Sequence, residues 1–300
     1  MSAVLAIKRA GPLTTVQDDG RHGMLAHGIS ASGPMDRGAY RRAGMRAGAG
    51  EKAGIEFTQA GLELVVKAGA IRIGWDGGDF SIRINGQDRD WPGAALVSAG
   101  DVLSVTPGGC GNYGYLRFGG EIDLPMVLGS RATNMRAKIG GLDGRALRAG
   151  DELGFSAFAG VPEGPVEKSD EEGPIRFVRG LHWDRFSEHA RDGFVAGRFR
   201  VTPVLDRMGV RLEDVDEVFG GESILSLISD PVLAGDIQIL GDGTPIVLMR
   251  DHQPTGGYPR IGTIISADLD RFAQLRPGRE LAFAPVSVDH AQRLLRSRGI

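Results

Sequence analysis

Hydrophobic and polar residues alternate along several short stretches of the chain. The alternation is clearest at residues 70–74, 80–85 and 102–106, where every second residue is apolar. A period of two places the apolar side chains on one face of a strand, so these segments predict strands with one buried face. Turn signals such as Asn85-Gly86 and Gly241-Asp242-Gly243 recur about every ten residues. This spacing favours sandwiches or barrels over a parallel, doubly wound sheet.

Few segments have the periodicity of a helix. Asp36 can cap a helix that places Tyr40, Ala43 and Ala47 on one face, and Ser287 can cap a closing helix over residues 288–296. Two further short helices are expected at residues 183–191 and 267–275. The fold class predicted from these patterns is mainly β with a few short helices.

A change of composition divides the chain into two parts. Residues 160–174 are rich in Pro, Gly and charge and lack apolar periodicity, which is typical of a linker. We therefore expect an N-terminal domain over residues 1–159 and a C-terminal domain over residues 175–300. The segment 146–155 is nearly repeated at 274–283, and more loosely at 96–105. Duplication and the chance recurrence of a common turn explain this similarity equally well.

Composition and charge exclude several classes of protein. The 300 residues include 41% hydrophobic residues and 47 glycines without a collagen period, and they carry a net charge of −3. With aromatic residues at only 6%, nothing favours nucleic acid as a partner. The single cysteine, Cys110, and the scattered histidines have no metal-ligand spacing, so no metal is expected. No apolar run is long enough to cross a membrane and no signal peptide is recognisable, which predicts a cytoplasmic protein.

Polar side chains are dense near the N-terminus. Gln17, Asp18 and Arg21 lie close together in the sequence, and Ser32 and Asp36 follow within fifteen residues. Such density is typical of a binding site. The alternative is a loop in which the aspartates form Asx turns and Asp36 caps the helix.

A second polar segment spans residues 127–141. It contains Arg131, Asn134 and Arg136 beside glycines that expose backbone N–H groups, and it can bind a carboxylate or a phosphate. It lacks the Gly-Lys-Ser/Thr of a nucleotide-binding loop. A solvated basic loop is the alternative.

The most distinctive stretch covers residues 247–266, where two apolar runs flank a polar segment that we expect to form a hairpin tip. Asp251 and Gln253 are two residues apart, so in an extended backbone both side chains point to the same side of the strand and can bind an amide or ureido group. A satisfied turn network explains the same residues nearly as well.

Five ordered segments of this chain resemble one known family. They are Thr14-Thr-Val-Gln-Asp-Asp-Gly-Arg, Ser32-Gly-Pro-Met-Asp, Leu128-Gly-Ser-Arg-Ala-Thr-Asn-Met-Arg-Ala, Asp206-Arg-Met-Gly-Val-Arg-Leu and Gln253-Pro-Thr-Gly-Gly-Tyr-Pro-Arg-Ile-Gly-Thr. In them the chain resembles the KipA-type proteins, also called allophanate hydrolase subunit 2-like proteins or C subunits of 5-oxoprolinase. These are similar to part of the carboxyltransferase region of urea carboxylase.

The resemblance implies a fold, partners and a reaction. The fold would be two cyclophilin-like β-barrel domains. The partners would be a KipI-like protein, which is the B subunit of 5-oxoprolinase, and a LamB/YcsF-like protein, which is the A subunit. The reaction would be ATP-dependent opening of 5-oxoproline to glutamate or, as an alternative, carboxyl transfer from carboxybiotin to urea or a small amide. A third hypothesis is a non-catalytic module that binds or regulates a KipI-like protein.

No cofactor is expected to be bound covalently to this chain. It lacks a Met-Lys-Met biotin-attachment motif and any nucleotide-binding signature, so ATP or carboxybiotin would come through partner subunits.

The resemblance also implies roles for particular residues. Asp251, Gln253 and Arg21 would form the catalytic group and position a lactam or its phosphorylated form. The expected substrate-binding residues are Gln17, Asp18, Ser32, Asp36, Arg131, Asn134, Arg136, Thr255, Gly256, Gly257 and Tyr258.

The chain departs from the family pattern at three positions. Asp19 stands where the family has Leu, and His252 and Pro254 stand where it has Arg and Thr. Proline removes a backbone N–H and fixes φ, so substrate choice can differ from that of relatives if that N–H contacts substrate.

Overall fold

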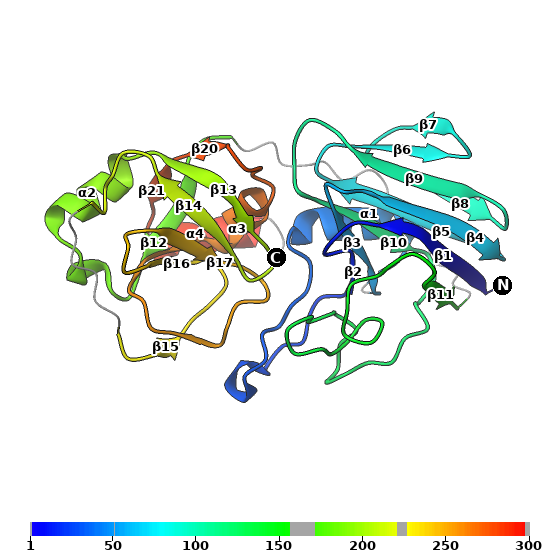
Figure 1. The fold of residues 1–300 in the computed structure, drawn as a ribbon, viewed down its shortest axis with the longest axis horizontal. Coiled ribbons are helices and arrows are strands. Elements are labelled where there is room, and N and C mark those ends of the chain that lie inside the picture. The colour runs from blue at the N-terminus through cyan, green and yellow to red at the C-terminus, as the bar shows by residue number, and fades with distance from the viewer. Residues whose placement is uncertain (1, 51, 157–171, 221–226, 298–300) are drawn as a thin grey trace. The chain divides into compact units, whose positions relative to one another are not determined.

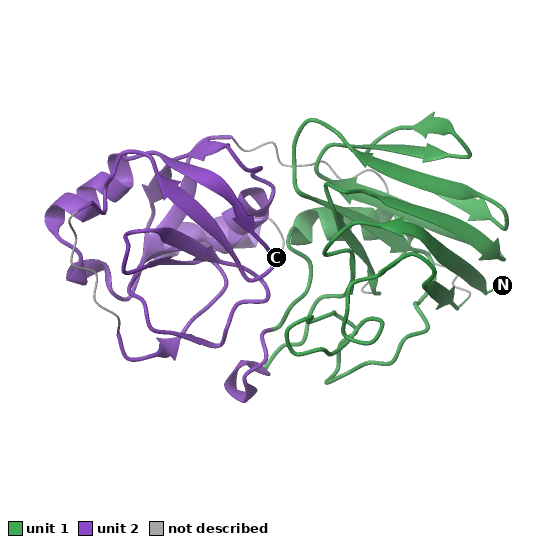
Figure 2. Cartoon of the chain, viewed as in Figure 1, with its two compact units in different colours: residues 1–23, 31–169 green, residues 24–30, 170–300 purple. Residues whose placement is uncertain are grey.

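The computed structural model describes residues 2–50, 52–156, 172–220 and 227–297, most of whose regular structure is strand (Figure 1). The chain divides into two compact units, residues 1–23 with 31–169, and residues 24–30 with 170–300 (Figure 2). The mainly-β prediction is confirmed. The predicted linker at 160–174 falls largely on 157–171, outside the described residues, so the predicted domain boundaries stay a prediction.

The first unit is built from two antiparallel sheets. The six-stranded sheet has the order β11-β1-β4-β9-β6-β7 and the five-stranded sheet the order β2-β3-β10-β5-β8. The strands of the first are β1 (Ala3–Ala10), β4 (Leu62–Ala68), β6 (Phe80–Ile84), β7 (Gln87–Arg89), β9 (Val102–Pro107) and β11 (Glu152–Phe155). Those of the second are β2 (Thr15–Gln17), β3 (Gly54–Thr58), β5 (Ala70–Gly77), β8 (Gly93–Ser98) and β10 (Tyr113–Phe118).

The two sheets of this unit share one apolar core. Phe80, Ile82 and Ile84 of β6 are buried while the residues between them are exposed, as the alternation predicts. From the other sheet, Ile73 and Leu116 join the same cluster. At the end of β6, Asn85 and Gly86 both have positive φ and form the two-residue connection to β7, which confirms the predicted turn.

Helix α1 (Arg37–Ala47) packs against β5 and β10. The Asp36 carboxylate accepts a hydrogen bond from the Ala39 N–H and so caps the helix, as predicted. Its buried residues include the predicted face of Tyr40, Ala43 and Ala47. Glycine is required where α1 meets β5, because a Cβ at Gly74 would overlap the Ala43 carbonyl oxygen.

The second unit contains an eight-stranded sheet with the order β20-β13-β14-β17-β16-β19-β12-β21. Its strands are β12 (Ile175–Arg179), β13 (Phe199–Leu205), β14 (Gly209–Asp214), β16 (Asp236–Ile239), β17 (Pro245–Leu248), β19 (Arg260–Ile264), β20 (Glu280–Leu281) and β21 (Phe283–Pro285). A separate two-stranded sheet pairs β15 (Asp230–Pro231) with β18 (Thr255–Gly256).

This sheet curls into a nearly closed barrel. The strands at its two edges, β20 and β21, are separated in the chain by Ala282 alone, so the edges must lie close together. Inside, Phe194 packs against Phe199 and Phe283, with ring centroids 5.4 and 4.8 Å away. The barrel architecture expected from the family resemblance is thus present in this unit.

The helices predicted in the second unit are present with one exception, and η1 (Leu25–His27) was not predicted. The others are η2 (Trp183–Arg185), α2 (Glu188–Ala196), α3 (Ser266–Ala273) and α4 (Val288–Ser297). The single helix predicted over 183–191 is wrong, because Phe186 is extended and Ser187 caps a new helix by accepting from the Ala190 N–H. None of the helices within the described residues has both the length and the apolar character that crossing a bilayer requires.

The repeated sequence segment adopts the same turn at all three places. Gly100, Gly150 and Gly278 all have φ between 85° and 96°, and each donates its N–H to a strand carbonyl, at Val66, Ile7 and Val201 respectively. The residue after each glycine accepts from the N–H of that same strand residue. The sequence similarity therefore reflects a shared way of joining a turn to a neighbouring strand, within both units.

The segment expected to form a hairpin tip is a crossover connection. Strands β17 and β19 do not pair with each other, because β16 lies between them. The predicted hairpin over 247–266 is therefore wrong. The sequence suggested a hairpin because the apolar runs at both ends of the polar segment are strands. The strand that lies between them in the sheet, β16, comes before both of them in the chain.

Candidate functional site

In the first unit, Asp18 ties two loops together. Its carboxylate accepts hydrogen bonds from the Gly20 N–H at 3.0 Å, from the Ser130 hydroxyl at 2.6 Å and from the Arg131 N–H at 2.5 Å. Asp18 was predicted to bind substrate. The structure gives both of its oxygens internal donors, so its direct effect is to hold the 127–141 segment against the N-terminal loop.

Arg21 also holds the 127–141 segment against the N-terminal loop. Its side chain is 1% exposed and donates to the carbonyl oxygens of Val127, Ser130 and Ala132 at 3.0, 3.3 and 2.9 Å. A guanidinium that donates to several carbonyls braces a loop that has no regular secondary structure. The catalytic role expected for Arg21 stays a prediction, and the structure adds a bracing role.

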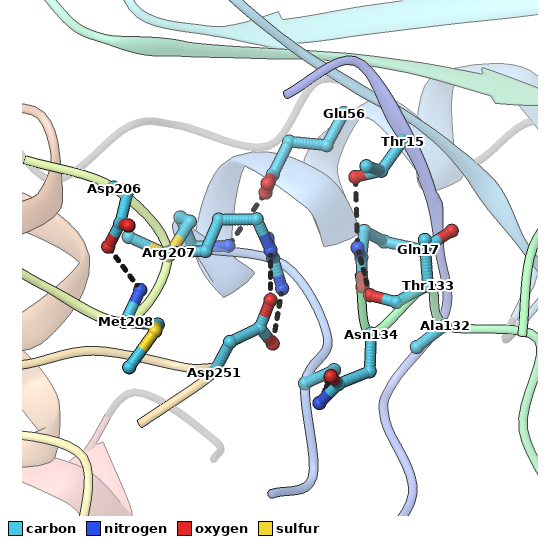
Figure 3. A network of polar contacts seen from close by, with 12 residues as sticks. Thr15, Gln17, Glu56, Ala132, Thr133, Asn134, Asp206, Arg207, Met208 and Asp251 are labelled. Carbon is cyan, nitrogen blue, oxygen red and sulfur yellow. Dashed lines mark hydrogen bonds and ion pairs between the residues drawn. The ribbon is translucent and has the colours of Figure 1, made fainter. Parts of the chain in front are cut away.

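Gln17 and Asn134 are also engaged within the unit, and Figure 3 shows the contacts of the Gln17 amide. The Gln17 amide donates to the Thr15 hydroxyl and the Thr133 carbonyl, and its oxygen accepts from the Gly33 N–H. The Asn134 amide donates to the Ser32 hydroxyl at 3.2 Å, with Ser32 in the left-handed region at φ 58°. Together with the capping bond of Asp36, these contacts favour the turn-network alternative for the N-terminal segment.

The two arginines of the 127–141 segment differ in their surroundings. Arg131 forms an ion pair with Glu121 at 2.7 Å and donates to the Leu124 carbonyl, so its charge is already compensated. Arg136 is exposed. Binding of a substrate carboxylate or phosphate by either residue stays a prediction.

Sequence reasoning missed a buried polar group in β3. Glu56 is fully buried and accepts from the Met35 N–H at 2.8 Å and from the Tyr115 hydroxyl at 2.9 Å (Figure 3). Burial, and after it the negative charge of Glu56, raises the pKa of Tyr115, so the phenol stays protonated and donates. The signal in the sequence was a lone carboxylate in an apolar strand, between Ile55 and Phe57.

In the second unit, Arg207 and Asp251 form a buried ion pair (Figure 3). Arg207 Nε and Nη2 donate to the two carboxylate oxygens at 2.8 and 3.2 Å, and the side chains are 2% and 6% exposed. The Asp251 N–H also donates to the Arg207 carbonyl, and the Met249 N–H to the Met208 carbonyl. The connection after β17 is thus fastened to the turn between β13 and β14.

This arrangement changes the interpretation of Asp251 and Gln253. Asp251 lies in a turn closed by a hydrogen bond from the His252 N–H to the Met249 carbonyl, not in extended backbone. Its carboxylate is held by Arg207, whereas Gln253 lines a cavity. The expectation that both side chains grip one ligand from an extended strand is therefore wrong, although a catalytic role for either residue stays a prediction.

That cavity has a volume of about 700 Å³ and lies on the sheet of the second unit. Its walls are largely apolar, with polar groups at a few places, which is the usual composition of a small-molecule site. The lining residues are Pro203, Val204, Leu205, Asp206, Met208, Gly209, Arg211, Gln238, Leu240, Ile246, Leu248, Gln253 and Tyr258.

The segment after Gln253 covers part of the sheet. Thr255 and Gly256 form β18, which pairs with β15, and the Gly257 carbonyl accepts from the Leu227 N–H. A Cβ at Gly256 would overlap Nε2 of Gln238, so a larger residue there would push the Gln238 side chain aside. Tyr258, which is 39% exposed, is on the cavity wall. Of the residues predicted here to bind substrate, Tyr258 lines the cavity and Thr255, Gly256 and Gly257 do not.

A histidine lies beside the same crossover. Nδ1 of His182 accepts from the Arg260 N–H at 3.2 Å, which leaves its proton on Nε2. Arg260 pairs with Asp230 and with Asp236. Burial, followed by the positive charge of Arg260, lowers the pKa of His182.

No group of three or more histidine, cysteine or carboxylate side chains within the described residues is arranged to hold a metal ion.

Comparison with known proteins identifies the class. A family model described as carboxyltransferase domain, subdomain A and B, matches residues 27–285. The chain therefore belongs to this carboxyltransferase domain family.

Individual relatives narrow the comparison. The chain is 35% identical to the C subunit of 5-oxoprolinase from Escherichia coli, over 96% of this chain and 93% of that protein. It is 31% identical to the corresponding protein of Haemophilus influenzae, over 95% and 92% of the two chains. It is also 31% identical to the urea amidolyase of Lachancea kluyveri, but spans only 17% of that protein.

Solved structures agree with these relationships. A crystal structure of TTHA0988 matches with a TM-score of 0.82 and 30% identity, over 94% of this chain and 55% of that one. The urea amidolyase of K. lactis matches with a TM-score of 0.87 and 28% identity, over 99% of this chain and 19% of that one. The chain thus corresponds to about half of the first structure and a fifth of the second.

Proposed function

We propose that this chain is the C subunit of a multi-subunit 5-oxoprolinase, which opens 5-oxoproline to glutamate at the expense of ATP. The observation that carries the proposal is the match to the Escherichia coli protein, which extends over nearly the whole of both chains. The urea amidolyases contain the same region as a small part of a much longer protein. The relative that is matched over nearly its whole length is therefore the better parallel.

The opening of 5-oxoproline determines which chemical steps the subunits must carry out together. The lactam C–N bond breaks, water provides the new carboxylate oxygen, and the ring nitrogen leaves as the amino group of glutamate. ATP hydrolysis drives the opening. This chain has no recognisable nucleotide-binding motif, so in the proposal ATP is handled by KipI-like and LamB/YcsF-like partners. The contribution of this chain is to bind and orient the lactam.

The test is release of glutamate from 5-oxoproline by this chain alone, by each pair of subunits and by the full set, with and without ATP. We expect turnover only with the full set and ATP. An assembled set, verified by gel filtration, that releases no glutamate would overturn the proposal. Omitting ATP from the active mixture is the matched control.

Carboxyl transfer is the second candidate. It is favoured by the family match itself and by the TM-score of 0.87 to the urea amidolyase of K. lactis over 99% of this chain. In this case the chain would act with a biotin-bearing partner on urea or a small amide. The assay is incorporation of labelled bicarbonate into urea in the presence of a biotin carboxylase and a biotinylated carrier. Assembly with partners but no activity in either assay would favour a binding or regulatory module.

A further inference from the structure

The cavity of the second unit contains a row of aligned side chains. Arg211 of β14 is in register with Ile246 of β17, and Ile246 is in register with Gln238 of β16. All three line the cavity. Because neighbouring strands are about 4.8 Å apart, Arg211 and Gln238 are about 10 Å apart at their backbones, on either side of an apolar residue.

Gln238 brings a hydrogen-bond acceptor to this row. Its side chain is 2% exposed and donates from Nε2 to the Tyr258 carbonyl at 3.4 Å. Within the described part of the chain, no group donates to its Oε1. This carboxamide oxygen is therefore available to a donor from a ligand or from water.

Gln253 brings a complete carboxamide. Its side chain is half-buried and lines the cavity, and within the described residues it makes no hydrogen bond. A carboxamide presents an N–H donor and a carbonyl acceptor on one edge. This edge is complementary to any group that offers an acceptor and a donor side by side, as when glutamine binds the edge of adenine.

Arg211 brings a charge. It is exposed, and its guanidinium forms no ion pair within the described ranges. Asp206 also lines the cavity, but its Oδ1 already accepts from the N–H groups of Met208 and Gly209. An arginine beside apolar walls is suited to a carboxylate.

We propose that this cavity binds a cyclic cis-amide, through Gln253 and Gln238, and that Arg211 selects ligands with a carboxylate on the ring. A cis-amide holds its N–H and its carbonyl on the same edge, which matches the carboxamide edge of Gln253. Lactams and cyclic ureas share this edge, whereas ring-opened glutamate lacks it. The proposal rests on the proposed function, for which 5-oxoproline is the lactam, and it names the residues that recognise that substrate.

Met208 provides a direct reporter, because it lines the cavity and its methyl group can be labelled with ¹³C in the full-length chain. Its NMR signal is assigned by its loss in Met208→Leu. We expect 5-oxoproline, 2-pyrrolidone and 2-imidazolidone to shift this signal. Glutamate and N-methylpyrrolidone, which lack the cis-amide N–H, should not shift it.

The variants separate the two parts of the site. Arg211→Gln should weaken 5-oxoproline binding about tenfold while leaving 2-pyrrolidone and 2-imidazolidone unchanged, because only 5-oxoproline carries the carboxylate. Gln253→Met and Gln238→Met should weaken all three by a similar factor. Arg200→Gln is the matched control, since Arg200 is also on this sheet but pairs with Glu213 and Glu280 outside the cavity.

Three results of the binding experiments would overturn the proposal. The first is that none of the three cis-amides shifts the Met208 signal at a ligand excess of about a hundredfold. The second is that glutamate shifts the signal as much as they do. The third is that Arg211→Gln weakens the binding of neutral and carboxylated ligands equally. If the assembled complex turns over 5-oxoproline with an unchanged KM in Arg211→Gln and Gln253→Met, the proposal fails and the proposed function stands. If 2-imidazolidone binds as described but the complex has no 5-oxoproline turnover, the function fails and the cis-amide site stands, with a cyclic urea as its ligand.

Discussion

Replacing Arg207 by methionine tests whether Asp251 is held in place structurally. All the hydrogen bonds that the described residues give to the Asp251 carboxylate come from Arg207, at 2.8 and 3.2 Å. The carboxylate is only 6% exposed, so water cannot readily replace the lost donors. Removing one partner of a buried ion pair costs about 3–5 kcal/mol, and methionine keeps most of the volume of the arginine stem.

The assay is urea unfolding combined with hydrogen exchange of peptides from β13–β14 and β17–β19. We expect Arg207→Met to lower the free energy of unfolding of the second unit by about 3–5 kcal/mol. The double variant Arg207→Met/Asp251→Leu removes both charges and should recover most of this loss. Hydrogen exchange in β4 and β9 of the first unit serves as the internal control.

The double variant also distinguishes a structural role of Asp251 from a role in the reaction. If Asp251 only fastens the crossover, the double variant keeps a folded cavity and binds cis-amides. If Asp251 takes part in the reaction, the double variant is stable but inactive in the assembled complex. A loss below about 1 kcal/mol in Arg207→Met, or no recovery in the double variant, would refute the reasoning that the pair is a buried, mutually dependent contact.

Three further predictions concern single positions. Helix propensity alone predicts that Gly44→Ala stabilises the protein by about 1 kcal/mol. However, the new Cβ would come within 2.9 Å of the Arg117 guanidinium, so we expect a net loss of stability of about 1 kcal/mol. Thermal unfolding should show a gain in stability from Gly44→Ala only when Arg117→Met is also present. Gly256→Ala should displace the Gln238 side chain and weaken cis-amide binding at the Met208 reporter with little change in global stability, and an unchanged affinity would contradict this. Because burial lowers the pKa of His182, the unfolded chain binds more protons there as pH falls below about 6.5. Unfolding free energy should therefore fall as the pH drops from about 7 to about 5.5, and His182→Gln should flatten this dependence, whereas parallel curves would contradict the assignment.

Local patterns predicted the local structure well. The alternation at residues 80–85 and the Asn85-Gly86 turn gave β6, its buried face and its connection to β7. Asp36 predicted the start of α1 because capping depends on residues three apart in sequence. Such features depend on neighbours along the chain, so a single sequence contains the information for them.

The predictions were wrong where residues far apart in the sequence determine the structure. Asp251 and Gln253 were paired because they are two residues apart, but the partner of Asp251 is Arg207, 44 positions away. The crossover was taken for a hairpin because the sequence does not show that β16 lies between β17 and β19. Gln238 and Arg211 were not recognised as site candidates, because only strand register brings them to one row.

The closure of the second barrel bears on how this protein folds during synthesis. Strand β12 begins the unit's sheet and pairs with β21, so Ile175 meets Phe283, more than a hundred residues later. A contact of such high sequence separation forms slowly, and an emerging chain cannot form it until β21 has left the ribosome. Until then β12 keeps an unpaired edge. Premature termination before β21 should therefore yield an aggregation-prone product, and co-translational folding should proceed from the first unit to the second.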